Sequence, residues 1–464
     1  LKSQIKGRLP LQPRSIQQIR SLPFISRHMA SHDAEAPPVQ SSKKGDRSGE
    51  LTSLNPASST SNGSRGANVK QLLMGAMGPG LLVCLADTDA GCLLVASQSG
   101  YRFGYSLISL QILLIPVLYL VQELTVRLGV HAKKGHTACV MDRFGKGWGW
   151  ISCALLVISC TGAIVSELSG VASVLELWGA GPRLGAVVAA ISIVSAVMLC
   201  NYRQVEVFGI VVGLFELVFV GTMFFTRPSP QEIVDDMTTF HHRGSYWLLF
   251  SSNIGAVIMP WMIFFQQSAV VARRLNTQSD LQEERKHTLA GSVLTQVIMI
   301  GTMVTLAAAP KLGKDLKSIE NIQEVLAPMF GKTPSMILLS LAFVGSALCG
   351  AVVVSLAAAW AICEAARWED PFSMDRPISD SPRFYGAFLG IVAVGACIHL
   401  LGVNVVRLNV FIELIDSFLM PLVLCFLWLL VTGPLLPAEA RVFGKHKVFL
   451  ATLFTVVSVI AVTT

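Results

Sequence analysis

Charged side chains are scarce in this chain. Only 14% of its 464 residues are Asp, Glu, Lys or Arg, about half the share usual in soluble domains, and 52% are apolar. The mean hydropathy is correspondingly high, at +0.59. A protein of this composition has too few charges to cover a water-exposed surface. We therefore predict an integral membrane protein that crosses the bilayer many times, and not a soluble enzyme.

Several functional motifs are also absent. No Gly-x-x-x-x-Gly-Lys-Ser/Thr sequence occurs, which argues against an ATP-driven pump. The ten cysteines include no Cys-x-x-Cys pair and most lie in apolar runs, so we interpret them as small buried hydrophobic residues. The net charge of +7 comes entirely from residues 1–70, which hold 11 basic and 4 acidic residues. The apolar body is therefore neutral, which argues against a nucleic-acid partner.

The N-terminal tail, residues 1–70, differs from the rest of the chain. It is rich in Ser, Pro, Gln, Asn and Gly and has no sustained apolar period, so we expect it to be disordered. Before Asp33, basic residues alternate with Leu, Ile and Phe, which is typical of a mitochondrial transit peptide. A competing interpretation takes Met29 as the start and residues 1–28 as an upstream extension.

The apolar body, residues 71–464, contains eleven runs long enough to cross a bilayer. We expect repeat 1 over about 72–226, repeat 2 over about 246–432 and an extra helix over 447–464. With a cytoplasmic N-terminus, the inner loops carry 15 Lys and Arg and the outer loops 8, which favours this orientation. The eleven runs cover about 72–99, 104–128, 149–177, 184–201, 205–226, 246–272, 288–310, 335–364, 384–402, 405–432 and 447–464.

The first run is interrupted at mid-membrane. Gly78-Pro79-Gly80 is followed by Asp87 and Asp89, and no basic residue lies within the run. Two residues apart, these acids would diverge on a continuous helix, so they share a site only if the helix unwinds. A lone carboxylate at the bilayer centre costs about 2.5–3.5 kcal/mol on insertion scales, so the pair needs a cation, a partner or a proton.

The sixth run has a matching interruption. Pro260 lies in the middle of an uncharged stretch and removes a helical hydrogen bond, which leaves carbonyl groups near Ala256 without a partner. Met259 then places a thioether beside the break. Interrupted first helices in two five-span halves indicate an inverted-repeat transporter with its site at the two breaks.

Further acids lie in other runs. Glu167 is in the third run and Glu216 in the fifth; Glu216 has no motif support, so we interpret it as a structural hydrogen-bonding group. Glu413 and Asp416 are at i and i+3 in the tenth run and hence on one helix face. Arg407 lies upstream, so an ion pair with that face is an alternative to a role in ion passage.

These segments together resemble the NRAMP family of divalent metal-ion transporters over about residues 71–464. Asp89-Ala-Gly-Cys92 looks like the family's Asp-Pro-Gly-Asn motif, and Ala256-Val-Ile-Met-Pro-Trp261 looks like its Ala-x-x-Met-Pro-His. Ser166-Glu-Leu-Ser-Gly170 resembles its third-span segment. The resemblance implies an all-α LeuT-type fold of two inverted five-helix repeats with broken helices 1 and 6. It also implies metal ligands at Asp89, Cys92, the Ala256 carbonyl and Met259. We further assign the buried acids Glu167 and Asp416 to a proton or charge pathway.

Departures from the family pattern affect the predicted coupling and selectivity. Trp261 and Ile164 replace a histidine and an aspartate that the family associates with proton movement, so proton coupling is doubtful. Asp87 is an additional carboxylate, and Glu413 stands where the family usually has Gln. Extra hard oxygens favour Mg²⁺ or Mn²⁺, whereas Met259 favours Mn²⁺ or Fe²⁺. The pattern is closest to the divergent branch that includes magnesium transporters.

We therefore predict a non-enzymatic transporter of Mn²⁺, Fe²⁺ or Mg²⁺, working by alternating access between broken helices 1 and 6. Its partners are the metal ion, as substrate, and the lipid bilayer; we expect no cofactor and no obligate protein partner. The membrane is the plasma membrane or that of an organelle, including the mitochondrion. The alternative is a symporter of amino acids or other organic solutes with the same fold, although the clustered acids would repel a substrate carboxylate.

Overall fold

The computed structural model describes residues 78–242, 244–313, 316, 318–368, 374, 378–402 and 405–463. Within these ranges, the side chains of 182, 405–415, 417, 418 and 461–463 are not described. The predicted disordered tail, residues 1–70, lies outside the described residues and stays a prediction. All the regular secondary structure of the described residues is helical.

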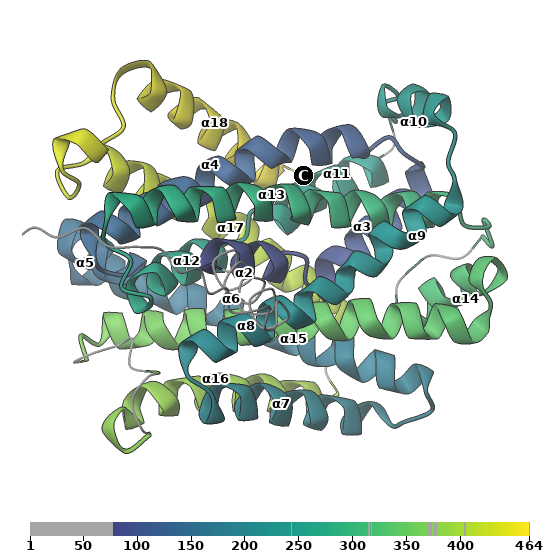
Figure 1. Cartoon of the computed structure of the whole chain (residues 1–464), viewed down its shortest axis with the longest axis horizontal. Helices are drawn as coiled ribbons and strands as arrows, with labels where there is room; N and C mark the ends of the chain where they lie inside the picture. The colour runs from purple at the N-terminus through teal and green to yellow at the C-terminus, as the bar shows by residue number, and fades with distance from the viewer. Residues whose placement is uncertain are drawn as a thin grey trace, which may run out of the picture. The chain divides into compact units, whose positions relative to one another are not determined.

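Each of the eleven predicted runs corresponds to one helix or to helices in close succession (Figure 1). Seven spans pass a length and hydropathy test among the described residues, and α2 with α3 form one further, bent span. The helices of the spans are α2 (Pro79–Ala86), α3 (Ala90–Phe103), α4 (Ile108–Ala132), α6 (Lys146–Leu177), α7 (Pro182–Leu199), α8 (Tyr202–Gly213), η1 (Leu214–Leu217), α9 (Val218–Thr226), α11 (Gly244–Val257), α12 (Pro260–Ala272), α13 (Gln278–Ala307), α15 (Lys332–Ala365), α16 (Pro382–Leu400), α17 (Val405–Thr432) and α18 (Gly444–Thr463).

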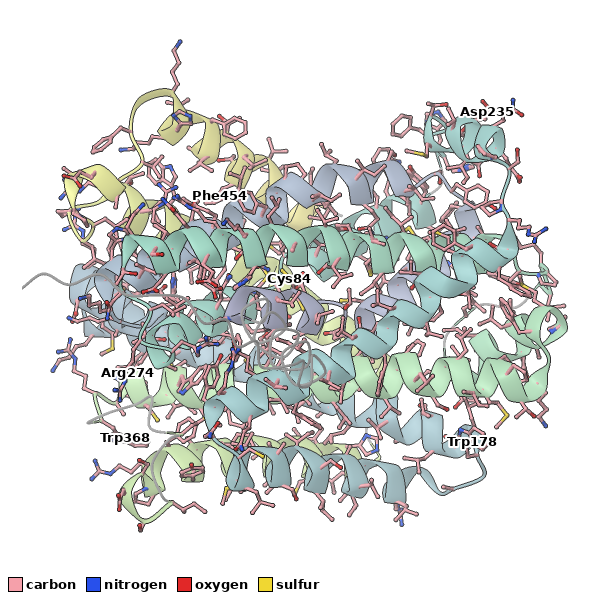
Figure 2. The ribbon with its side chains drawn as sticks, viewed as in Figure 1. Cys84, Trp178, Asp235, Arg274, Trp368 and Phe454 are labelled. Carbon is pink, nitrogen blue, oxygen red and sulfur yellow. The ribbon has the colours of Figure 1, made fainter. Side chains whose placement is uncertain are left out.

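Short elements connect the spans at their ends. Figure 1 shows α5 at one end of the helices, and α10 and α14 at the opposite end. In Figure 2, Arg274 and Trp368 mark the first of these ends, and Trp178 and Asp235 the second. The short elements are α5 (His136–Phe144), α10 (Pro230–Met237), α14 (Ile319–Phe330), η2 (Ile378–Asp380) and η3 (Ala438–Ala440).

The first break comprises residues 87–89, between α2 and α3, whose axes differ in direction by 54°. Asp87 ends α2, and Asp89 begins α3 as its N-cap. At the start of the span, Pro79 occupies the first turn of α2, where its missing N–H costs nothing. The first break thus lies at Asp87 and Asp89, where the sequence predicted it.

The second break comprises residues 258–259, between α11 and α12. Met259 has an extended backbone, with φ −93° and ψ 142°, and Pro260 opens α12. Proline fixes a helical φ but disfavours the helical conformation in the residue before it, so the helix restarts at Pro260. Both breaks predicted from the sequence are therefore present.

The structure adds a third irregularity that the sequence analysis did not predict. The fifth run, expected to be one continuous helix, contains the 3₁₀ segment η1 between α8 and α9. A 3₁₀ turn within a helix changes the direction in which its side chains point. Glu216 lies in this turn.

The seventh span begins ten residues before its apolar run. Thr277 caps α13 by accepting a hydrogen bond from the backbone N–H of Asp280, and the Asp280 side chain accepts one from the N–H of Thr277. This capping box starts the helix in a polar segment that a hydropathy criterion passes over.

The broken first span lies between two long helices. Both α2 and α3 pack against α13 and α15, and α2 also packs against α8. In turn, α15 packs along α6. Small residues permit these close approaches: a Cβ at Gly345 of α15 would collide with the carbonyl oxygen of Val212 in α8. The turn at 87–89 is therefore enclosed by α6, α13 and α15.

Candidate metal-binding site

Asp89 is held at the first break by the helix that follows it. Its side chain accepts a hydrogen bond of 2.8 Å from the backbone N–H of Cys92, and 8% of the residue is exposed. A carboxylate at this position is stabilised by the unpaired N–H groups and the positive end of the helix dipole. The cap fixes the direction of the carboxylate within the broken span.

Cys92 and Ala256 connect the two breaks. The Cys92 thiol donates a hydrogen bond of 3.2 Å to the Ala256 carbonyl oxygen. In a regular helix this oxygen would accept from residue 260, but Pro260 has no N–H. The structure therefore brings three of the predicted ligands, Asp89, Cys92 and the Ala256 carbonyl, into one chain of contacts.

The Met259 sulfur has a partner that the sequence analysis did not anticipate. The indole Nε1 of Trp261 donates to it over 3.1 Å, and Trp261 itself is fully buried. Trp261 therefore has a structural role of its own at the position of the motif histidine, because its indole N–H fixes the orientation of the Met259 thioether beside the second break.

Asp87 differs from Asp89 in having no cap. It is 1% exposed, and neither carboxylate oxygen has a hydrogen-bond partner among the described residues. It lies within electrostatic range of Asp89 and of Cys84, which Figure 2 shows among the helices at the centre of the bundle. A buried carboxylate without hydrogen bonds is costly unless a cation or proton accompanies it.

Glu167 of α6 is a second buried carboxylate close to Asp89. It is 1% exposed, and both of its carboxylate oxygens lack a partner in the described part of the chain. Gly350 of α15 leaves room for this carboxylate: a Cβ there would lie 3.1 Å from Glu167 Oε1 and 3.3 Å from the Asp89 Cβ. Glu167 and Asp89 are thus neighbours, and Gly350 lies beside both of them.

Glu216, which the sequence analysis interpreted as structural, also reaches the first break. Its Oε2 contacts the hydroxyl of Thr88, and Oε1 has no partner among the described residues. Glu216 is fully buried and lies within electrostatic range of Asp89 and Glu167. The signal in the sequence was a single charge in the apolar stretch 207–226.

Among the described residues, no ion pair joins a basic side chain to any of these four acids. The ion pairs of the described residues involve other acids, namely Glu123, Asp142, Glu206 and Glu284. Nor does any group of three or more His, Cys, Asp and Glu side chains in the described ranges form a closed metal cage. A metal at the breaks would therefore combine carboxylate with backbone, thiol and thioether ligands.

The tenth span contributes less to this picture. Asp416 of α17 lies within electrostatic range of Cys160 in α6. The side chains of Glu413 and Arg407 lie outside the described residues. Their predicted roles stay predictions.

The half-helices α2 and α12 are tied to their neighbours at the end of the bundle marked by Arg274 and Trp368 (Figure 2). The backbone N–H of Gly80 donates to Glu284 of α13 over 3.2 Å. Arg273, after α12, pairs with the buried Glu206 of α8 at 2.5 Å, and Ser268 donates to Glu364 of α15 over 3.0 Å. These contacts tie both half-helices to their neighbours at this end of the bundle.

Known proteins share both the sequence pattern and the fold. The chain is 25% identical over 409 residues to a divalent metal cation transporter MntH of Verminephrobacter eiseniae, covering 84% of this chain and 87% of that protein. The crystal structure of an Eremococcus coleocola manganese transporter, in complex with an aromatic bis-isothiourea-substituted compound, superposes with a TM-score of 0.66 at 18% identity, covering 85% and 86% of the two chains. The nucleobase-cation-symport-1 transporter Mhp1, with bromovinylhydantoin bound, gives 0.55 at 15% identity, covering 83% and 91%.

These likenesses confirm the fold prediction: an all-α membrane protein of the LeuT type with broken first and sixth spans. Residues 80–464 match the family described as natural resistance-associated macrophage protein-like. This match covers nearly the whole predicted membrane body. The chain is a multi-pass integral membrane protein and belongs to the natural resistance-associated macrophage protein-like, or NRAMP, family.

Proposed function

We propose that this protein transports a divalent metal cation across a membrane through a site formed by the two breaks. One observation carries the proposal: the Cys92 thiol contacts the Ala256 carbonyl while the same helix end holds Asp89. The contact brings together a carboxylate, a sulfur and a carbonyl that has no helical N–H partner, at the two breaks. Family membership and the similarity to MntH transporters support the same substrate class.

We propose that the protein works by alternating access, and the contacts that tie the half-helices to their neighbours support this proposal. For an ion to leave at the end marked by Arg274, α12 must separate from α8 and α15, and α2 from α13. The Arg273–Glu206 pair, the Ser268–Glu364 bond and the Gly80–Glu284 bond all oppose that movement. We propose that they form the closed gate at this end and break together as one repeat moves against the other.

We propose that this gated end faces the cytoplasm. The segments at this end include residues 131–148 and 273–287, which contain eight of the 15 basic residues counted as inner. Labelling of a single cysteine at 280 by an impermeant reagent from outside intact cells would contradict this orientation.

The choice of ion depends on two opposing kinds of ligand. Carboxylates favour small hard ions such as Mg²⁺, whereas the Met259 sulfur binds Mn²⁺ and Fe²⁺ better. Glu413→Gln removes a charge that the sequence places near the site, so we expect the ratio of Mn²⁺ to Mg²⁺ uptake to rise. An unchanged ratio, with both rates scaled to folded protein, would reject a role for Glu413 in selectivity.

Coupling to protons is weak in our proposal, because neither Trp261 nor Ile164 can exchange a proton. The test is to record the pH inside proteoliposomes during metal uptake. Acidification in fixed proportion to the metal taken up would refute uncoupled transport.

The central experiment is uptake by the purified full chain in liposomes, with Mn²⁺, Mg²⁺, Ca²⁺ and amino acids offered separately. Asp89→Ala should abolish divalent uptake while the protein still folds and inserts. Asp142→Ala is the control, since it removes an acid that pairs with Lys134 and Arg367 at a partly exposed position. Uptake of amino acids but not of metal would favour an organic-solute symporter, and near-normal metal uptake by Asp89→Ala would refute the site.

A further inference from the structure

We infer that the protein binds a second, monovalent hard cation such as Na⁺ at the first break, between Thr88, Glu216 and Glu167. This position lies on the α6, η1 and α15 side of Asp89, whereas the proposed transport ligands Cys92, Ala256 and Met259 lie toward the second break. The inference concerns an ion other than the transported one, and it is testable without any divalent metal.

The Thr88 hydroxyl gives the first argument. Its Oγ1 lies 2.8 Å from the carbonyl oxygen of Leu85 and also contacts Oε2 of Glu216. A hydroxyl has one hydrogen, so it donates to only one of these two oxygens. A threonine hydroxyl usually donates its hydrogen to the carbonyl oxygen three residues earlier in the helix, which is here Leu85. A lone pair of the Thr88 hydroxyl oxygen then faces the Glu216 carboxylate. A cation that binds both oxygens removes that repulsion.

The unpartnered oxygens give the second argument. Glu216 Oε1 and both carboxylate oxygens of Glu167 are buried and have no hydrogen-bond partner among the described residues. The two glutamates lie within electrostatic range of each other and of Asp89. A buried anion without hydrogen bonds or a counter-charge is unfavourable, and three beside one another are more so. The ion pairs of the described residues engage other acids. The compensating positive charge is therefore a proton or a bound cation, and we infer the cation.

The backbone favours a cation at the same place. Helix α2 ends at Ala86, and the negative end of its dipole points at Thr88. The 3₁₀ turn η1 directs Glu216 toward this helix end from the neighbouring span. Carbonyl-rich ends of half-helices are general binding places for monovalent coupling ions in transporters with broken helices.

Charge and ligand number favour a monovalent ion over a second divalent one. The proposed transport site lies on the other side of Asp89, and two divalent ions repel twice as strongly as a divalent and a monovalent ion at the same distance. The described residues also contain no group of three acids, histidines or cysteines arranged around a metal. Two carboxylates and a hydroxyl suit a singly charged, oxygen-seeking ion.

The test measures thermal unfolding of the purified full chain in detergent with a chelator, at constant ionic strength, as Na⁺ replaces N-methyl-D-glucamine. A ligand that binds only the folded state raises Tm, and we expect a saturable rise of about 2–4 °C in the wild type. Glu216→Gln, which keeps the shape of the side chain, should lose this rise. Asp142→Asn, which changes a partly exposed acid that pairs with Lys134 and Arg367, should keep it.

A second pair of variants guards against misfolding of Glu216→Gln: Thr88→Ala should lose the Na⁺-dependent rise, and Thr88→Ser should keep it. Absence of the rise in the wild type, or its persistence in both Glu216→Gln and Thr88→Ala, would overturn the inference. A rise with Mg²⁺ but not Na⁺, in the absence of chelator and dependent on Glu216, would overturn the choice of a monovalent ion. Failure of metal uptake in liposomes would leave this result unaffected, because no divalent ion is present in the Na⁺ titration.

Discussion

Replacing Gly350 with alanine would place a methyl group between the two carboxylates that flank the first break. The added Cβ would lie 3.1 Å from Glu167 Oε1, 3.2 Å from its carboxylate carbon and 3.3 Å from the Asp89 Cβ. These separations are shorter than ordinary van der Waals contacts. Either Glu167 or Asp89 must therefore move by a few tenths of an ångström.

The magnitude of the effect separates transport from stability. Overpacking costs about 1–3 kcal/mol, while alanine in place of glycine within a helix stabilises by about 1 kcal/mol, so the free energy of unfolding falls by only about 0–2 kcal/mol. Displacing a metal ligand or its supporting group typically lowers affinity or activity about 10- to 100-fold. We expect Gly350→Ala to be well folded and to take up metal at least tenfold more slowly.

The assay is metal uptake into proteoliposomes, scaled to the amount of folded protein measured by size-exclusion chromatography. Gly386→Ala in α16 is the matched control, because a Cβ there would have no neighbour within 4 Å. Gly345→Ala is a contrasting variant: its Cβ would collide with the backbone of α8, so it should fail in folding first. Equal uptake by Gly350→Ala and Gly386→Ala would refute the argument that transport depends on the position that Asp89 holds beside Glu167.

Three further predictions follow from contacts away from that glycine. Arg273→Ala removes one of two arginines that pair with the buried Glu206, so it should weaken the proposed gate. A cysteine placed on α12 should then be labelled faster than in the parent protein, and an unchanged rate of labelling would exclude this ion pair from the gate. Trp261→Phe removes the N–H that holds the Met259 sulfur, so the ratio of Mn²⁺ to Mg²⁺ uptake should change, whereas an equal fall for both ions would indicate a packing role alone. Burial lowers the pKa of His136 from 6.5 to about 4, so the contribution of neutral His136 to stability is complete above pH 6.5 and is lost as the pH falls from 6.5 toward 4. His136→Gln should therefore flatten the dependence of Tm on pH in that range, and a pH profile identical to that of the wild type would contradict the prediction.

Sequence alone located both breaks because they depend on local chemistry. Pro260 removes a backbone donor wherever it is placed in a helix, and two aspartates in an apolar run cannot remain in an ordinary membrane helix. The apolar runs likewise gave the spans, since a bilayer requires about 20 apolar residues for each helix. The early start of α13 was missed because Thr277 and Asp280 extend it through polar residues.

The contacts across the break could not be predicted in the same way. Glu216 has no motif of its own, and its contact with Thr88 depends on the 3₁₀ turn and on the packing of α2 against α8. The Trp261–Met259 hydrogen bond depends on the extended backbone at Met259, which directs the following indole back toward the sulfur. These contacts join segments that pack together only in the folded protein, so a local sequence pattern does not predict them.

The same arrangement would make the proposed site weaker than a structural metal site, which suits a transporter. A closed cage of three or more strong ligands would hold a divalent ion too firmly to release it, and no such cage is formed among the described residues. The Asp89 carboxylate accepts a hydrogen bond from the Cys92 N–H, the Cys92 thiol donates one to the Ala256 carbonyl, and the Met259 sulfur accepts one from the Trp261 indole. Each ligand therefore has a partner within the protein that it can regain when the ion leaves. Release replaces ion contacts with these internal hydrogen bonds, which lowers the cost of emptying the site and allows the gate to reset.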